Sequence, residues 1–148
     1  MRALIQRVKE GGVTIDGKTH AEIGKGLVIL LGIRKGETPD AADFLAEKCM
    51  ALRVFEDSNG KMNLSVSDIG GDVLVVSQFT LYADTQKGNR PGFSEAAPPE
   101  EAEPLYEQFV GRIRSALDDG KVRTGVFRAM MEVKIINDGP VTILLESK

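Results

Sequence analysis

The sequence is poor in the residues that most often carry enzymatic chemistry. Among 148 residues it has one cysteine, one histidine and no tryptophan. The single cysteine, Cys49, excludes an intramolecular disulfide and a cysteine-rich metal site, and it fits a reducing compartment. The single histidine, His20, follows an Asp16-Gly17 hairpin turn and is expected to be exposed, so a histidine-based metal centre or Ser-His-Asp triad within one subunit is not expected. We predict no metal, no cofactor and a cytoplasmic location.

Long apolar runs are also missing. No stretch approaches the length of a membrane span, and charge interrupts the N-terminal sequence MRALIQRVKEGG too early for a signal peptide. The apolar fraction of 42% and charged fraction of 28% are those of a globular protein, and the length predicts one domain, residues 1–148. A net charge of −3 argues against broad nucleic-acid binding, although six basic residues between Arg112 and Lys134 leave room for a local basic face.

Hydrophobic patterning predicts a sheet built from several short strands. Two continuous apolar runs are typical of strands buried on both faces, and the other segments are shorter or alternate. Gly11-Gly12 is expected to form a turn after the first strand, and residues 137–140 a turn between the last two. The expected strands are residues 2–9, 13–15, 19–23, 27–33, 52–55, 73–76, 121–124, 129–136 and 141–146.

Two helices are expected to cover this sheet. The first begins at Thr38, which can cap it, and Pro39 suits the first helical position. Its apolar stripe contains Cys49, which therefore packs in the core and is not a nucleophile. The second helix spans residues 98–117, with Gly120 as its stop.

The candidate site lies where the strand at residues 73–76 ends in Ser77, Gln78, Phe79 and Thr80. Hydroxyls, an amide and freed backbone N–H groups are the components of an oxyanion hole for acyl chemistry. A threonine nucleophile needs a base, and none is nearby in sequence. The alternative is that these polar groups only satisfy the end of a buried strand. The following segment, residues 83–97, is long for a loop and is expected to wall a pocket.

Five sequence blocks carry a resemblance to a known family. They are MRALIQRV at residues 1–8, SQFTLYAD at 77–84, AAPPE at 96–100, PLYEQF at 104–109 and NDGPVT at 137–142. Together, and in this order, they resemble the D-aminoacyl-tRNA deacylases, the D-Tyr-tRNA deacylase family. The resemblance implies an α/β fold of the α+β type, in which a mixed or antiparallel barrel-like sheet carries two main helices. It also implies a homodimer with active sites at the subunit interface.

The implied activity is hydrolysis of the ester that joins a D-amino acid, or mischarged glycine, to the terminal adenosine of tRNA. The family's catalytic residues fall on Ser77, Gln78, Phe79 and Thr80, and its substrate-binding residues on Arg7, Asn137, Gly139 and Pro140. In the family, the Gly-cisPro element reaches into the partner's pocket, where its carbonyls bind the amino group and exclude an L side chain. Arg7 matches a residue that holds this element in place.

Two mechanisms and two other functions stay open. Either Thr80 is the nucleophile, or the ribose 2′-hydroxyl of the tRNA assists while backbone groups of Phe79 and Thr80 hold the substrate. The absence of a nearby base favours the second mechanism. The other functions are a small-molecule esterase with a Thr80 nucleophile and a non-catalytic oligomeric scaffold. One departure from the family pattern is Gly92, which follows Pro91 where a serine is expected.

Overall fold

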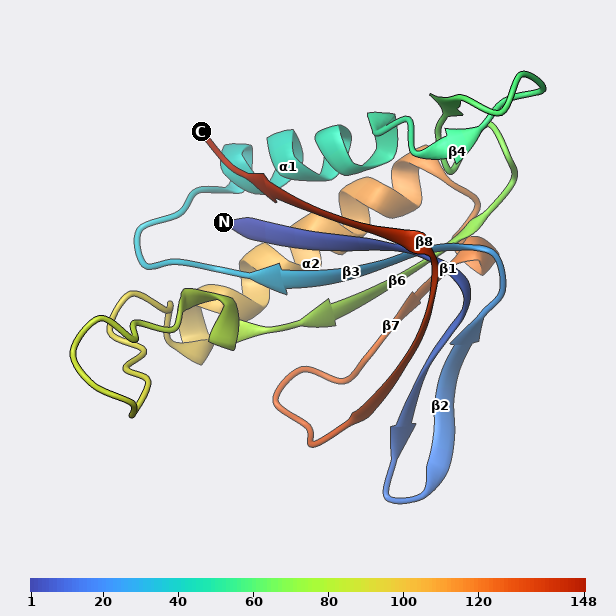
Figure 1. The fold of residues 1–148 in the computed structure, drawn as a ribbon. Helices are drawn as coiled ribbons and strands as arrows, with labels where there is room; N and C mark the ends of the chain where they lie inside the picture. The colour runs from blue at the N-terminus through green and yellow to red at the C-terminus, as the bar shows by residue number, and fades with distance from the viewer.

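The computed structural model describes residues 1–148 as a strongly curved sheet with two helices packed along its outside (Figure 1). The strand order is β2-β1-β3-β6-β7, and β8 pairs with β1. The β3–β6 and β6–β7 pairs are parallel, whereas β1 is antiparallel to β2, β3 and β8. The predicted fold class, a mixed barrel-like sheet with two main helices, is confirmed. In chain order the elements are β1 (Arg2–Ile15), β2 (Lys18–Ile23), β3 (Gly26–Gly32), α1 (Pro39–Ala51), β4 (Phe55–Glu56), β5 (Met62–Leu64), β6 (Asp72–Ser77), the 3₁₀ helix η1 (Phe79–Tyr82), α2 (Pro99–Ala116), the 3₁₀ helix η2 (Asp119–Lys121), β7 (Val122–Thr124) and β8 (Glu132–Glu146).

The predicted turn at Gly11-Gly12 is wrong, because β1 continues without a break to Ile15. Its first half lies between β3 and β8, and its second half lies between β2 and β8. A Cβ atom on Gly11 would lie 2.8 Å from Cγ2 of Val28. The glycine therefore serves a close approach between strands as β1 crosses the curved sheet, and not a chain reversal.

The two strands predicted after residue 128 are one strand, β8, and residues 129–131 precede it. Both halves of β8 pair antiparallel with β1: Thr142 pairs with Gln6, and Asn137 pairs with Val8. The chain between Asn137 and Thr142 therefore bulges outward and does not reverse. Both halves can follow the same neighbouring strand only because the direction of the chain is kept.

The helix boundaries follow local capping chemistry. Thr38 Oγ1 accepts a hydrogen bond from the Ala41 N–H at 3.2 Å, as expected for the cap of α1. The strand predicted at residues 52–55 is wrong, because only Phe55 belongs to a strand. The helix α2 ends at Ala116, so Gly120 is not its stop. Neither α1 nor α2 combines the length and the hydropathy that crossing a membrane requires.

The core between the sheet and the helices contains Cys49, whose side chain is completely buried. Burial raises the pKa of its thiol to about 12, so the neutral thiol packs as a small apolar group, as predicted. The Tyr106 hydroxyl donates a hydrogen bond of 2.9 Å to the carbonyl of Val75. This bond fixes α2 against β6, the strand that leads into the candidate site. His20 is exposed in the β1–β2 hairpin, as predicted.

Candidate active site

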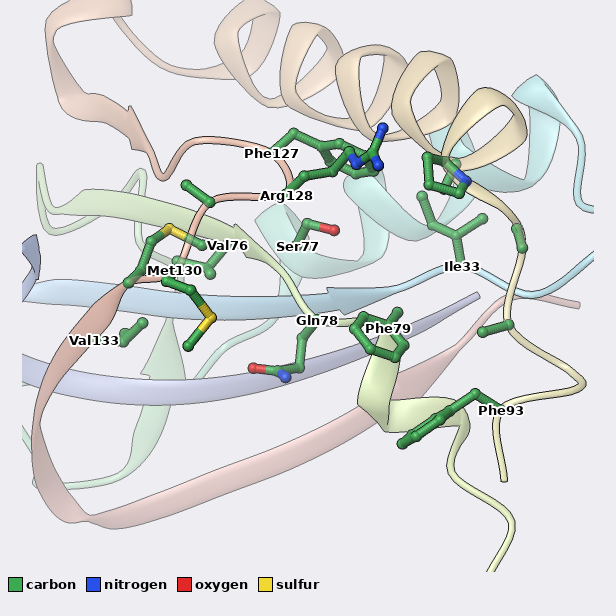
Figure 2. Close-up of a pocket in the computed structure, with 16 residues that line it drawn as sticks. Ile33, Val76, Ser77, Gln78, Phe79, Phe93, Phe127, Arg128, Met130 and Val133 are labelled. Carbon is green, nitrogen blue, oxygen red and sulfur yellow. The ribbon is translucent and has the colours of Figure 1, made fainter. Parts of the chain in front are cut away.

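A cavity of about 620 Å³ opens where β6 ends (Figure 2). Sixteen residues line it, and twelve of them are hydrophobic. Ser77 and Gln78 lie on one part of its wall, and Arg128 is the only charged residue in the lining. The loop predicted to wall a pocket contributes Phe93, Ala96 and Ala97, which confirms that prediction.

The strand β6 holds Ser77 and Gln78 in place at this cavity, because neighbouring strands pair with it on both sides. It is buried from Val73 to Val76 and lies parallel between β3 and β7. Ser77 is its last residue and pairs with Leu31, and the Gln78 N–H donates to the Leu31 carbonyl at 2.8 Å. The chain then turns at once into η1. The N–H groups that open such a helix have no carbonyl partner within it, so the N–H groups of Phe79, which lines the cavity, and of Thr80, which follows it, lack a partner inside η1.

Aromatic and thioether side chains form the mouth of the cavity. Phe79 is 56% exposed, and its ring meets that of Phe93 edge to face, with 5.0 Å between the ring centroids. Met130, which also lines the cavity, is 91% exposed. Large apolar groups left in solvent beside a cavity mark a binding surface. Flat aromatic faces of this kind suit a nucleobase, on which they can stack.

Thr80 differs from the other three predicted catalytic residues because it does not line the cavity. Its side chain is exposed, and its hydroxyl accepts a hydrogen bond from Nε2 of Gln78. No carboxylate or imidazole is hydrogen-bonded to that hydroxyl. The structure therefore provides Thr80 with an amide donor and not with a base.

The four predicted substrate-binding residues form a second group around the bulge of β8. Arg7 is only 7% exposed, and it donates from Nε to the Asp138 carbonyl at 2.8 Å and from Nη1 to the Val54 carbonyl at 2.7 Å. Asn137 braces the same bulge, because its Oδ1 accepts from the Val141 N–H at 2.8 Å. The Gly139–Pro140 peptide bond is cis, and both residues are exposed.

The two groups are far apart within one chain. Ser77 pairs with Leu31 near the end of β3, whereas Asn137 pairs with Val8, which pairs with Gly26 at the start of β3. An offset of five residues along a strand corresponds to roughly 17 Å. No residue of the bulge lines the cavity. The cavity of one chain and its own Gly139–Pro140 element therefore do not meet.

The segment that follows β7 is the part of the site that sequence patterns do not predict. Residues 127–131 line one wall of the cavity. They have neither helical nor strand periodicity, and the strand expected from residue 129 begins only at Glu132. Gly92 is paired with Asp84 through two backbone hydrogen bonds of 2.7 and 2.8 Å. A Cβ atom there would approach nothing closer than 3.9 Å, so the backbone has room for a side chain at this position.

Comparison with known proteins identifies the family. The family described as D-Tyr-tRNA(Tyr) deacylase matches residues 4–146. A D-aminoacyl-tRNA deacylase of Carboxydothermus hydrogenoformans is 54% identical over 146 residues, which cover 99% of each chain. That of Anaeromyxobacter dehalogenans is 55% identical over 149 residues, covering 100% of this chain and 98% of the relative.

Solved structures show the same fold. One titled c-Myc DNA Unwinding Element Binding Protein superposes with a TM-score of 0.95 and 43% identity, covering 100% of this chain and 99% of the other. A probable eukaryotic D-amino acid tRNA deacylase superposes with a TM-score of 0.83 at 16% identity, covering 98% of both chains, which shows similarity of fold alone. On its sequence matches over nearly the whole chain, the protein belongs to the D-Tyr-tRNA(Tyr) deacylase family.

Proposed function

We propose that the protein hydrolyses the ester of D-aminoacyl-tRNA, releasing the D-amino acid and free tRNA. Mischarged glycyl-tRNA is a second substrate in this proposal. Each subunit is a single domain of a cytoplasmic homodimer, and each cavity is completed by the partner subunit. The family supports the reaction. The observation that supports the two-subunit site is the separation of the cavity from the Gly139–Pro140 bulge within one chain.

Chiral selection follows from main-chain recognition in such a dimer. The exposed bulge is held from behind by Arg7 and Asn137, so its position does not depend on the substrate. Carbonyl groups of Gly139 and Pro140 would bind the amino group and fill the space of an L side chain. Contacts made by main-chain atoms depend on the configuration at Cα and not on the identity of the side chain. Glycine has no side chain to exclude and would therefore also be accepted.

The proposed chemistry relies on positioning and polarisation. The Gln78 amide and the N–H groups that open η1 stabilise the negative charge that develops on the carbonyl oxygen of the ester in the transition state. Because no base contacts Thr80, the nucleophile comes from water, with help from the ribose 2′-hydroxyl of the substrate. The wall of apolar side chains excludes bulk water and strengthens these interactions.

The activity is tested by incubating the purified protein with D-Tyr-tRNA and L-Tyr-tRNA and following release of tyrosine. We expect rapid release from the D substrate and none above background from the L substrate. Release from neither would favour a scaffold, and equal release from both would contradict the chiral filter. Analytical ultracentrifugation should show a dimer at the concentrations used.

A Thr80→Ala variant distinguishes the proposed mechanism from an esterase with a Thr80 nucleophile. We expect it to keep deacylation within about tenfold of wild type, because the lost hydroxyl only accepts a bond from Gln78. Removal of a true nucleophile lowers kcat by several orders of magnitude. Single-turnover rates on D-Tyr-tRNA measure the difference, and a loss of that size would make Thr80 the nucleophile.

A further inference from the structure

Arg128 has no role in the site described so far, yet it is the only charged side chain that lines the cavity. It takes part in none of the ion pairs or side-chain hydrogen bonds of the protein. Arg7 and Arg112 have carbonyl or carboxylate partners. Arg90 and Arg123 also lack a side-chain partner, but neither of them lines the cavity. An arginine without a partner beside an apolar cavity has all five of its N–H donors available for a ligand.

The backbone around Arg128 is fixed in an unusual conformation. Arg128 has a φ of 69°, and the only other non-glycine residue with positive φ is Asp16 in a hairpin turn. For a bulky residue this conformation costs on the order of 1 kcal/mol and is typical of functional sites. The segment is anchored to β6, because the Gly125 N–H donates to the Val75 carbonyl at 3.1 Å. The Ala129 N–H then closes a turn on the Val126 carbonyl at 3.1 Å.

Figure 2 shows the consequence for the side chain: Arg128 faces the cavity on the other side of Ser77 from Gln78. The cavity thus has three chemically distinct parts. Ser77 and Gln78 offer polar groups, Phe79 and Phe93 offer an aromatic surface, and Arg128 offers a positive charge.

These three parts correspond to the three parts of an aminoacylated 3′-terminal nucleotide, which is the substrate of the proposed function. The ester lies at the polar groups, the base lies on the aromatic surface, and the phosphate that links this nucleotide to the rest of the tRNA is the remaining charged group. We propose that Arg128 binds that phosphate. The guanidinium fork matches phosphate oxygens and forms charge-assisted hydrogen bonds with them. Because the protein carries a net charge of −3, a cation at the cavity mouth favours binding of the polyanion there.

Two stable ligands test this subsite: adenosine carrying D-tyrosine through a 3′-amide, with and without a 5′-phosphate. Their affinities for wild type and for Arg128→Gln are measured by isothermal titration calorimetry. We expect the phosphate to tighten binding to wild type by about tenfold to a hundredfold. The Arg128→Gln variant should lose this gain and bind the phosphate-free ligand as wild type does. Arg123→Gln, an exposed change outside the cavity, should keep the full gain.

The outcomes separate this inference from the function on which it rests. If the phosphate-free ligand binds wild type but the phosphate adds nothing, or if Arg128→Gln keeps the gain, the phosphate subsite is wrong and the proposed function stands. If neither ligand binds wild type, both fail. As a second readout, the dependence of log K on log salt for binding of intact tRNA should become shallower by about one in Arg128→Gln.

Discussion

A Gly139→Ala variant is expected to lose at least about tenfold of the preference for D- over L-aminoacyl-tRNA. Gly139 has a φ of 147°, a conformation that residues with a side chain rarely adopt. An alanine Cβ would lie 2.8 Å from the backbone nitrogen of Val141 and 3.3 Å from Nη2 of Arg7. The first contact involves backbone, so the bulge itself must shift. A shifted bulge would no longer hold its carbonyls where, in the proposed dimer, they would exclude an L side chain.

The measurement is the ratio of initial rates on D-Tyr-tRNA and L-Tyr-tRNA for wild type and variant. Gly111→Ala is the matched control, because Gly111 lies within α2 with no atom within 4 Å of an added Cβ. That change should leave the ratio unchanged and stabilise the helix by roughly 0.5–1 kcal/mol. If the ratio is unchanged in Gly139→Ala as well as in the control, the bulge does not determine selectivity.

The features predicted correctly from the sequence are those that local chemistry decides. The run from Val73 to Val76 is apolar at every position, so a buried strand is predicted whatever the order of strands in the sheet. Thr38 and Pro39 determine a helix start through hydrogen bonds and φ angles within a few residues. The two groups of site residues come from the resemblance of the SQFT and NDGPVT blocks to a family, and their roles stay a prediction. Neither block indicates by itself how far apart they lie in one chain.

The features predicted wrongly depend on partners distant in sequence. Gly11 is compatible with a turn or with a close approach of strands, and only the position of Val28 decides between them. The bulge at residues 138–141 resembles a turn locally, and only its pairing with one continuous strand shows that it is not. Arg128 and Met130 reach the cavity through an irregular segment, for which hydrophobic periodicity offers no prediction.

The largest expected effect on stability comes from Arg7→Met, which keeps the apolar stem and removes the charged donors. Two carbonyl groups, those of Val54 and Asp138, would lose their guanidinium partner, and the Val54 bond is buried. The cost should be roughly 3 kcal/mol in the free energy of unfolding, measured by urea denaturation. Arg112→Met is the matched control, because its ion pair with Glu47 is half exposed and contributes at most about 1 kcal/mol.

The same substitution links stability to recognition, because Arg7 joins the bulge of β8 to the chain after α1. Below the unfolding transition, folded Arg7→Met should therefore discriminate D from L substrates less well, since nothing else donates to the Asp138 carbonyl from the side of β1. Arg7→Lys should have a urea midpoint and a D/L selectivity between those of wild type and Arg7→Met. One ammonium group on a flexible stem cannot reproduce the two divergent hydrogen bonds of the guanidinium. Equal urea midpoints for Arg7→Met and Arg112→Met would show that the buried arginine does not fix the element. Selectivity would then depend on the rigidity of the bulge alone, which Asn137 would have to supply through its bonds to Val141.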